Sequence, residues 1–283
     1  MNPIQLAPNR TVVTSFTTTN SLDDGHYVLH LCTNNTSASN KPQIPLITCA
    51  LTNRSIHTYN NETLQKVHSI EQAHTAAITD LTHSSSYIVS SSQDGYVKLF
   101  DLRTHGGSPA LQMLLPKKEQ ALTATLGYGG TLAAVGGSKG TIHFYDLRNA
   151  PPTGGGGGTT AAAAEPLGSY VDAHTDEVTR VRFQPNSHDS STTTPLLVSA
   201  SEDGLVCVHD TSQPSEEMAL KSVLNVQSPL REVGFFGPSM EGVYCLTGSE
   251  TISVWHHESA QPLFQFGDNV RDVLSGMLGG GMA

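Results

Sequence analysis

Two groups of residues in the sequence have the types found in a Ser-His-Asp catalytic triad. The first group is His74, Ser90 and Asp94. The second group, further along the chain, is His174, Ser199 and Asp203. Such a set can activate a serine for attack on an ester or amide carbonyl. However, neither serine lies in the G-x-S-x-G turn that presents a nucleophile, and the set occurs twice. We therefore interpret both groups as structural and predict no catalytic residue.

The stretch around Ser90 predicts a small antiparallel sheet. Two short apolar runs, Ile78–Leu81 and Tyr87–Ser92, are followed by an Asp94-Gly95 turn and a third run, Tyr96–Phe100. Asp-Gly between alternating runs is a strong signal for a β-hairpin. A lone meander of short strands cannot bury both of its faces, so it predicts further copies packed against it.

The same ending recurs at a nearly even spacing along the chain. An aromatic residue or a histidine precedes a polar residue after each β run, and the five polar residues are Asn60, Asp101, Asp146, Asp210 and His256. The steps between them are 41, 45, 64 and 46 residues, and the long step contains a glycine- and alanine-rich insert, Pro151–Glu165. Repeats of about 40–45 residues with four strands each are typical of β-propeller blades.

This ending and this spacing resemble the WD40-repeat family, with the best copies at Ala73–Arg103 and Ala173–Asp210. A longer stretch, Ala173–Val273, resembles one particular member of that family. The resemblance implies an all-β fold, a WD40-type β-propeller of four-stranded blades, and an interaction protein without known chemistry. It also implies that a turn histidine, a serine, an aspartate and an aromatic residue form a buried tetrad in each blade. The structural tetrad residues are then His74, Ser90, Asp94, His174, Ser199, Asp203 and Trp255.

The repeats predict a single domain over residues 1–283. We expect blades at about 20–70, 71–116, 117–172, 173–226 and 227–267, a partial blade at 268–283, and a flexible insert at 149–166. The family has seven blades and about five and a half are present, so we expect a truncated chain, with an unconventionally completed ring as the alternative. Phe100 offers no N–H, His209 replaces the aromatic residue, and Trp255 has no turn histidine. We therefore expect degraded tetrads.

Two consecutive blades end in nearly the same motif, Phe-Asp-Leu-Arg at Phe100–Arg103 and Tyr-Asp-Leu-Arg at Tyr145–Arg148. These motifs resemble the arginine-bearing motif of substrate receptors for cullin-RING ubiquitin ligases, which implies a ligase adaptor as partner. Strand three runs away from the Asp-Gly turn, so both arginines should lie on the face opposite the turn histidines. There, Arg103 and Arg148 are available to a partner's carboxylates. The alternative is that each arginine pairs with its own aspartate, Asp101 or Asp146.

The composition narrows the class of partner. The net charge is −10 and only 14% of the residues are charged, which disfavours nucleic acid as a partner. No apolar run has the length of a signal-peptide core or a membrane span, so we expect no membrane partner. Four isolated cysteines form no C-x-x-C pair, and they are Cys32, Cys49, Cys207 and Cys245. We interpret them as buried thiols of an intracellular protein, located in the nucleus, the cytoplasm or both.

Two further patterns suggest ligands but predict ordinary structure. Gly136–Thr141 lacks the spacing of a phosphate-binding loop and predicts a hairpin turn. His256-His257 has no carboxylate or cysteine at ligand spacing, so we interpret this pair as solvated strand-end residues. We predict no metal and no cofactor. The expected function is a non-catalytic scaffold for other proteins, and the alternative is a substrate receptor of a cullin-RING ubiquitin ligase.

Overall fold

The computed structural model describes residues 26–34, 45–84, 87–104, 107–149, 163–185 and 195–266. The expected first strand at Thr11–Phe16, most of the long loop after Thr33, and the partial blade at 268–283 lie outside these residues. Most of the insert at 149–166 also lies outside them, since residues 150–162 are not described.

The described chain forms five four-stranded antiparallel sheets, which confirms the expected all-β fold class. Sheet one contains β1 (Val28–Thr33), β2 (Leu46–Leu51), β3 (Ile56–Asn60) and β4 (Lys66–Ile70). Sheet two contains β5 (Ile78–Ser84), β6 (Tyr87–Ser92), β7 (Tyr96–Asp101) and β8 (Leu111–Leu114). Sheet three contains β9 (Ala121–Gly127), β10 (Leu132–Gly137), β11 (Ile142–Asp146) and β12 (Gly168–Tyr170). Sheet four contains β13 (Val178–Phe183), β14 (Leu196–Ser201), β15 (Leu205–Asp210) and β16 (Leu220–Asn225). Sheet five contains β17 (Leu230–Phe236), β18 (Gly242–Thr247), β19 (Ile252–His256) and β20 (Gln261–Phe266).

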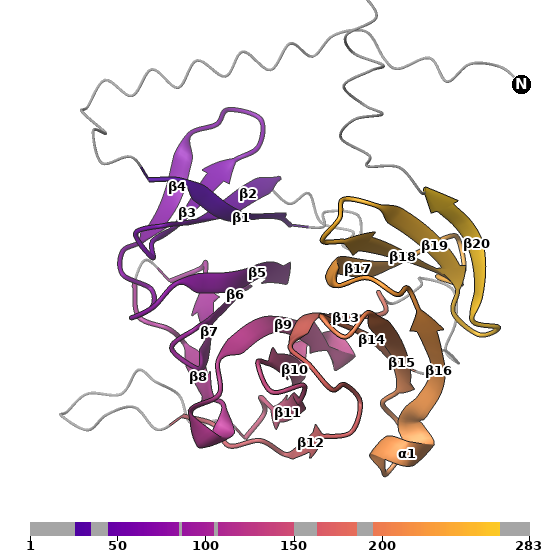
Figure 1. The fold of residues 1–283 in the computed structure, drawn as a ribbon. Helices are drawn as coiled ribbons and strands as arrows, with labels where there is room; N and C mark the ends of the chain where they lie inside the picture. The colour runs from indigo at the N-terminus through magenta and orange to yellow at the C-terminus, as the bar shows by residue number, and fades with distance from the viewer. Residues whose placement is uncertain are drawn as a thin grey trace, which may run out of the picture.

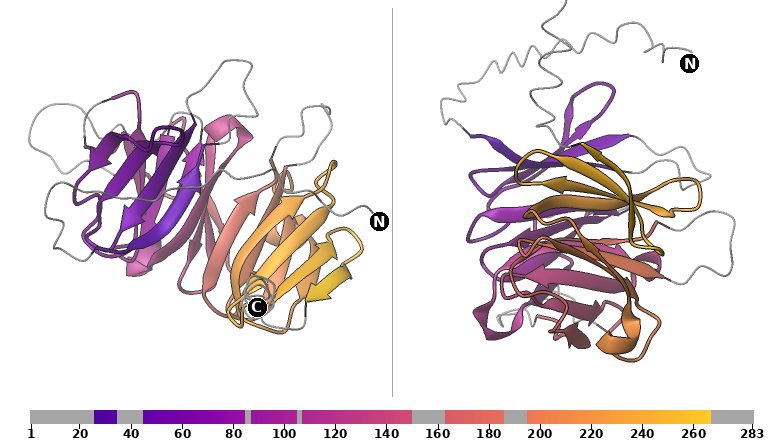
Figure 2. Two further views of the ribbon diagram at one scale, coloured as in Figure 1. Left: turned by 90° about the horizontal axis from the view of Figure 1, so that it is seen from above. Right: turned by 45° about the vertical axis from the view of Figure 1, so that its right-hand side comes forward.

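Within each sheet the strands pair in chain order, so every sheet is a simple meander. The described helical segments are short connections: η2 (Pro116–Lys118), η3 (Tyr128–Gly130) and α1 (Glu216–Ala219). The sheets are arranged around a common axis, with the first strand of each sheet on the inside and the fourth on the outside (Figure 1). The strands run between two faces of this array, where the connecting loops lie (Figure 2).

The tight turns between second and third strands follow from glycine and aspartate. Gly95 and Gly204 adopt left-handed φ angles of +82° and +81°, which suit glycine far better than other residues. The Oδ1 atom of Asp94 accepts a hydrogen bond from the Tyr96 N–H at 3.0 Å and fixes the turn. Gly136–Thr141 forms the hairpin turn between β10 and β11, as predicted.

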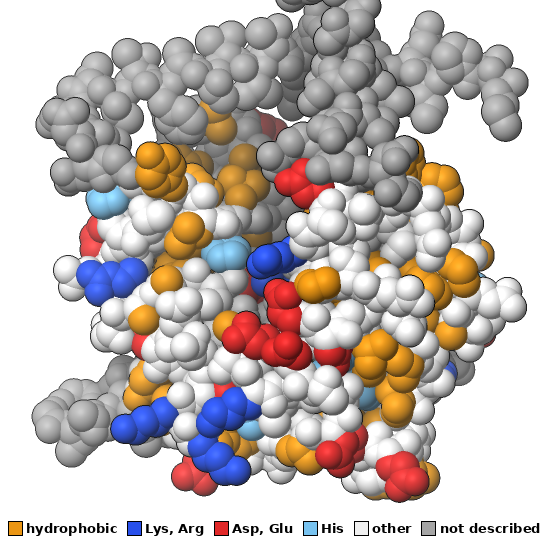
Figure 3. Space-filling model, viewed as in Figure 1, with side chains coloured by type: hydrophobic (Ala, Val, Ile, Leu, Met, Phe, Trp, Pro, Cys, Tyr) orange, Lys and Arg blue, Asp and Glu red, His pale blue; other side chains and the backbone are white. Residues whose placement is uncertain are grey.

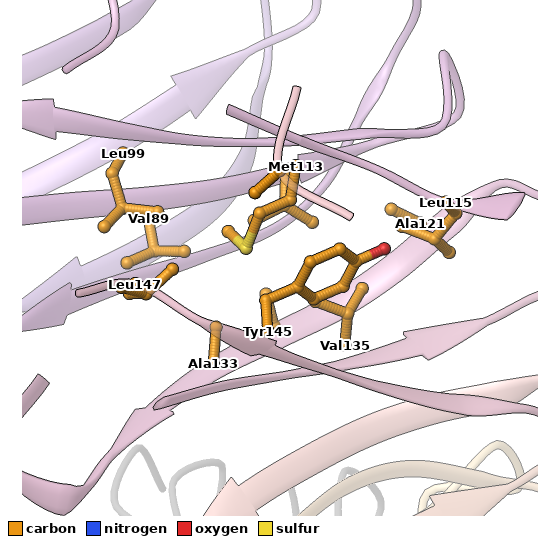
Figure 4. Close-up of a cluster of buried hydrophobic side chains, with 12 residues drawn as sticks. Val89, Leu99, Met113, Leu115, Ala121, Ala133, Val135, Tyr145 and Leu147 are labelled. Atoms are coloured by element: carbon orange, nitrogen blue, oxygen red, sulfur yellow. The ribbon is translucent and has the colours of Figure 1, made fainter. Parts of the chain in front are cut away.

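Apolar clusters fill the four spaces between successive sheets. The cluster between sheets one and two includes Ile56, Ile70, Ile88 and Phe100. The cluster between sheets two and three includes Val89, Leu99, Met113 and Tyr145 (Figure 4). The cluster between sheets three and four includes Ile142, Phe144, Val178 and Leu197. The cluster between sheets four and five includes Val208, Leu224, Val243 and Trp255. Burying each large apolar side chain stabilises the fold by roughly 1.5–3 kcal/mol, so each sheet depends on its neighbours.

One residue of the segment expected to be a flexible insert packs in a core. Ala164, which lies inside the insert, is buried in the cluster between sheets two and three. Its N–H donates to the carbonyl oxygen of Gln112 at 2.9 Å, and it bridges to Met113 in β8. A small side chain with a paired backbone can pack against a strand edge even in a segment of low complexity.

Apolar side chains remain exposed on sheets one and five, which stand at the two ends of the series (Figure 1). Leu31 in β1 is 62% exposed, and Phe264 in β20 is 49% exposed and in contact with the ring of Phe266. No described sheet lies between sheet one and sheet five. The side of the fifth sheet is therefore exposed within the described residues.

Charged side chains from three sheets form a network near the axis, which we call the axial network. Nη1 of Arg182 lies 3.0 Å from Oδ2 of Asp80, and Nη2 lies 3.2 Å from Oε1 of Glu232. Arg180 donates from Nε to Glu232 at 2.8 Å, and Thr123 donates to Asp80 at 2.6 Å. Acidic and basic side chains lie side by side near the centre of the face shown in Figure 3. The network connects β5, β9, β13 and β17, the inner strands of four sheets.

Asp80→Ala should destabilise the protein strongly, because it leaves the guanidinium of Arg182 without its buried carboxylate partner. Breaking a buried ion pair from one side lowers the free energy of unfolding by about 3 kcal/mol. Urea denaturation at pH 7 measures this change. Asp172→Ala, which removes an exposed carboxylate, is the matched control and should change the value by less than about 0.5 kcal/mol. Equal effects of the two substitutions would contradict the prediction.

Candidate functional site

In sheet two the structure brings His74, Ser90 and Asp94 together as a hydrogen-bonded chain. Nδ1 of His74 lies 3.1 Å from Oδ2 of Asp94, and Nε2 lies 2.7 Å from Oγ of Ser90. Burial lowers the pKa of His74, although the Asp94 carboxylate opposes this shift. Phe100 is buried nearby and has no N–H with which to extend the chain.

Sheet four repeats this arrangement with His174, Ser199 and Asp203. The Nδ1–Oδ2 distance between the histidine and the aspartate is 3.1 Å, and the Nε2–Oγ distance to the serine is 2.9 Å. His209 extends the chain, because its Nε2 lies 3.4 Å from Oγ of Ser199. Burial, with a smaller contribution from His174, lowers the pKa of His209 to about 4.

Neither serine is accessible to a substrate. Ser90 and Ser199 have no exposed surface, and both hydroxyl groups lie within sheets rather than in a pocket. A nucleophile must reach the carbonyl that it attacks, so these groups could act only if the sheets opened. The geometry therefore fits a role in stabilising the sheet, with each hydrogen bond adding roughly 0.5–1.5 kcal/mol to the free energy of unfolding.

Sheet five has no equivalent chain. Nε1 of Trp255 donates to Oγ of Ser253, on the same strand, at 2.9 Å. Thr247, Ser249 and Thr251 form a separate hydroxyl network at the turn, with an Oγ1–Oγ1 distance of 2.7 Å between the two threonines. Trp255 thus packs in the core beside sheet four without joining a tetrad.

Sheet three contains a buried network that the sequence did not predict. Glu119, between β8 and β9, accepts hydrogen bonds from the Lys139 N–H at 2.8 Å and from Thr141 at 2.7 Å. Its Oε2 lies 3.1 Å from Nε2 of His143, whose Nδ1 lies 2.7 Å from Oγ of Ser169. These hydrogen bonds keep the pKa of Glu119 below its ordinary value although burial opposes this. Glu119 thus supplies the buried acceptor that sheet three otherwise lacks.

Gly137 makes space for this network. A Cβ atom at Gly137 would lie 2.0 Å from Oε1 of Glu119, far inside van der Waals contact. Gly137, at the end of β10, therefore indicates that a side chain packs over it. Without the fold, however, this glycine does not indicate which side chain is involved.

The two arginine motifs have nearly identical geometry. Nε and Nη2 of Arg103 bind both carboxylate oxygens of Asp101, at 2.9 and 2.7 Å. Arg148 binds Asp146 through the same atoms at the same two distances. Both arginines are thus paired with their own aspartates, yet their side chains remain 66% and 70% exposed.

The motifs lie at the strand ends opposite the Asp-Gly turn. β7 begins after that turn, and Asp101 at its far end pairs with Tyr87. The guanidinium of Arg103 stacks over the Tyr87 ring at 5.6 Å, and its Nη2 donates to the Tyr87 hydroxyl at 3.2 Å. Hydrogen bonds from Arg148 lower the pKa of Asp146 to about 2, so this aspartate stays ionised. The arrangement holds two planar cation donors in fixed directions at one face.

The structure corrects one expectation. His257 is not a solvated strand-end residue, because only 5% of it is exposed. Its ring is stacked parallel to that of His256, with centroids 6.0 Å apart, and its edge meets the ring of Phe235. In the part of the chain that the structure describes, no three His, Cys, Asp or Glu residues could share a metal ion.

The cysteines form no disulfide. Cys49, Cys207 and Cys245 are buried, and Cys32 is partly buried. Burial raises the pKa of Cys32, Cys207 and Cys245 to about 12, so these thiols stay protonated at neutral pH. No helix of the described segments has both the length and the apolar character needed to cross a membrane.

Comparison with known families identifies two repeats in the chain. Residues 64–101 and 164–210 match the family model described as WD domain, G-beta repeat. The chain contains WD40 repeats. The first matched segment contains the chain His74–Ser90–Asp94, and the second contains His174–Ser199–Asp203. The family's structural tetrad therefore explains the residues that first suggested a triad.

Three curated relatives of this WD40-repeat protein carry the same repeats. The WD repeat-containing protein 89 homolog of Dictyostelium discoideum is 26% identical over 222 residues, covering 78% of this chain and 54% of that protein. WD repeat-containing protein GTS1 of Arabidopsis thaliana is 27% identical, with coverages of 75% and 50%. An uncharacterized WD repeat-containing protein of Saccharomyces cerevisiae is 28% identical, with coverages of 79% and 54%. The chain spans about half the length of the curated relatives it matches. The first of them bears the name of the family member that Ala173–Val273 resembles.

Two solved structures share the fold. The computationally designed protein Ika8 matches with a TM-score of 0.59 and 19% identity, over 84% of this chain and 62% of the other. A chain of the mitotic checkpoint complex matches with a TM-score of 0.61 and 14% identity, over 79% and 61% of the two chains. At these identities the likeness concerns the fold alone.

Gly137→Ala should destabilise the WD40-repeat protein by about 2 kcal/mol, because the new methyl group displaces the buried Glu119 carboxylate from its donors. Combined with Glu119→Ala, the same glycine substitution should have little further effect. A double-mutant cycle by chemical denaturation measures this coupling. Gly168→Ala is the control, since a Cβ there contacts nothing within 4 Å. Additive effects of Gly137→Ala and Glu119→Ala would contradict the proposed contact.

His209→Phe should reduce the acid sensitivity of the protein. The unfolded chain binds a proton at His209 below about pH 6.5, whereas the folded protein does so only near pH 4. Wild-type stability is therefore lost as the pH falls through this window. Relative to wild type, the variant should gain about 2 to 3 kcal/mol between pH 7 and pH 4.5. Guanidinium denaturation at both pH values measures this gain in stability. Equal losses of stability in the two proteins would contradict the lowered pKa of His209.

Proposed function

We propose that this WD40-repeat protein is a non-catalytic scaffold that holds other proteins on the loops and strand ends of its sheets. The observation that carries the proposal is that the triad-like polar groups are buried inside the sheets, whereas the arginine motifs are exposed. The serine and histidine side chains that resemble a triad form hydrogen bonds with each other inside the sheets. The charged groups of the arginine motifs remain exposed at one face. Rigid repeat arrays with exposed loops suit recognition, because little conformational entropy is lost on binding.

The proposal includes a location inside the cell, in the nucleus, the cytoplasm or both. Its support is the set of four unpaired cysteines, three of them buried. Secreted domains usually convert such residues into disulfides, whereas reducing compartments keep thiols free. Fractionation of cells that express the tagged protein tests this location.

The second candidate function is a substrate receptor of a cullin-RING ubiquitin ligase. It is favoured by the equivalent geometry of the two arginine motifs on adjacent sheets and by the exposure of both guanidinium groups. Each guanidinium already binds its own aspartate through Nε and Nη2. An adaptor would therefore have to contact each Arg–Asp pair without breaking it.

Affinity purification of the tagged full chain with quantitative mass spectrometry tests both functions. A scaffold should enrich a reproducible set of proteins over a tag-only control, and no enrichment would contradict the scaffold. If the receptor function holds, Arg103→Ala with Arg148→Ala should reduce adaptor recovery by about tenfold or more. Arg231→Ala, which truncates another arginine of 66% exposure, should leave recovery unchanged. Absence of an adaptor, or equal recovery from all three proteins, would exclude the receptor function.

A further inference from the structure

A pocket lies between sheets two and three, at the strand ends that carry the arginine motifs. Its volume is about 290 Å³, and its lining includes Tyr87, Leu99, Leu111, Leu126, Leu147 and Arg148. Because Asp101 pairs with Tyr87 and Asp146 pairs with Leu132, both motifs sit at the end of the sheets where this pocket opens. Neither the family comparison nor the sequence motifs indicate a pocket here.

The floor of the pocket is apolar and well supported. Leu99 and Leu147 belong to the buried cluster between the two sheets and lie at the end of it away from Leu115 (Figure 4). One wall is formed by Gly129 and Gly130, where a Cβ atom would contact nothing within 4 Å. The pocket therefore combines a fixed apolar base with an open side.

The rim of the pocket carries guanidinium and aromatic groups. Arg148 lines the pocket directly, and Tyr87 lines it from the opposite sheet. Arg103 reaches the same rim through Tyr87, since its guanidinium lies over the ring and donates to the hydroxyl. Tyrosine and arginine around a desolvated apolar centre are the composition of a protein-interaction hot spot.

We propose that this pocket binds an acidic segment of a partner protein, which inserts one bulky apolar side chain while its carboxylates pair with Arg103 and Arg148. This inference rests on the proposed scaffold function and assigns a surface and a partner chemistry to it. The volume of about 290 Å³ lies at the lower limit of the roughly 300–1,000 Å³ of ligand pockets, and it is large enough for one leucine, methionine or phenylalanine side chain.

The hydrogen-bond donors that remain on the two arginines favour an acidic rather than a basic segment. The hydrogen bonds to Asp101 and Asp146 come from Nε and Nη2 of each arginine, and no described residue accepts a hydrogen bond from either Nη1. These bonds orient the guanidinium groups and leave donors directed outward. The net charge of −10 opposes an acidic partner at long range. Screening within about 8 Å at physiological salt, however, makes the nearby arginines decisive at contact.

A binding measurement with synthetic peptides tests the proposal. The probe is a fluorescein-labelled pool, Gly-Ser-Asp-Glu-X-Glu-Asp-Ser-Gly, in which X is Leu, Ile, Met or Phe. Control pools replace X by Ser, or replace the four acidic residues by Lys. Fluorescence anisotropy with the purified full chain should show binding of the first pool at least about tenfold tighter than of either control. Equal binding of the three pools, or no binding of the first, would overturn the proposal.

Variants locate the binding site. Ala110 also lines the pocket, so Ala110→Phe fills it. Arg103→Glu with Arg148→Glu reverses the charge of the two arginines at the rim. Each change should weaken binding of the acidic pool about tenfold or more. Arg231→Glu, the matched control, makes the same change at an arginine of 66% exposure in sheet five and should leave binding unchanged. Circular dichroism verifies that each variant is folded. If Ala110→Phe does not fold, the serine control pool still tests the apolar anchor.

Two outcomes separate this inference from the scaffold function. If the acidic pool does not bind but the tagged chain still enriches proteins from cells, the pocket proposal fails and the scaffold stands. If the tagged chain enriches no proteins, the scaffold fails as well. A pool that binds only after deletion of residues 151–162 would assign the pocket to the protein's own insert and overturn the partner proposed here.

Discussion

The relative placement of the sheets depends on the axial network. Asp80 and Glu232 come from sheets two and five, while Arg180 and Arg182 come from sheet four. Burial alone would raise the pKa of Asp80, but the two arginine charges and the hydroxyl of Thr123 hold it well below its ordinary value. A strand alternates its faces, so a shift of one residue would turn Asp80 or Arg182 away from the axis. Each buried charge thus requires the inner strands of other sheets in one register.

Packing, rather than the polar tetrad, is what sheets two to five have in common. In these four sheets the residue near the end of the third strand is Phe100, Tyr145, His209 or Trp255, and each is less than 9% exposed. Their hydrogen bonds differ: Tyr145 donates to the Leu114 carbonyl, Trp255 to a serine of its own strand, and Phe100 makes no such bond. Burial of a large ring contributes roughly 1.5–3 kcal/mol, against about 1 kcal/mol for a net hydrogen bond. A degraded tetrad is therefore compatible with a stable sheet.

The sequence separation of the contacting residues explains what could be predicted from the sequence. The sheets and turns were predictable because alternation and Asp-Gly act within a few residues of one another. The contact of His74 with Ser90 was expected from the resemblance of Ala73–Arg103 to WD40 repeats. By contrast, Arg182 meets Asp80 across 102 residues, and Glu119 meets His143 outside any repeated pattern. The pocket between sheets two and three also depends on how two sheets pack, which no single segment encodes.

The arginine motifs contribute little to the stability of the fold. An ion pair at an exposed site adds little to folding, and Arg103 and Arg148 are largely exposed. The same pairing restricts two long side chains that would otherwise lose considerable rotamer freedom on binding a partner. Asp101 and Asp146 remain ionised because the arginines lower their pKa values, so both ion pairs persist at neutral pH. Because the fold needs these pairs so little, their near-identical geometry on adjacent sheets supports the proposed surface for a partner protein.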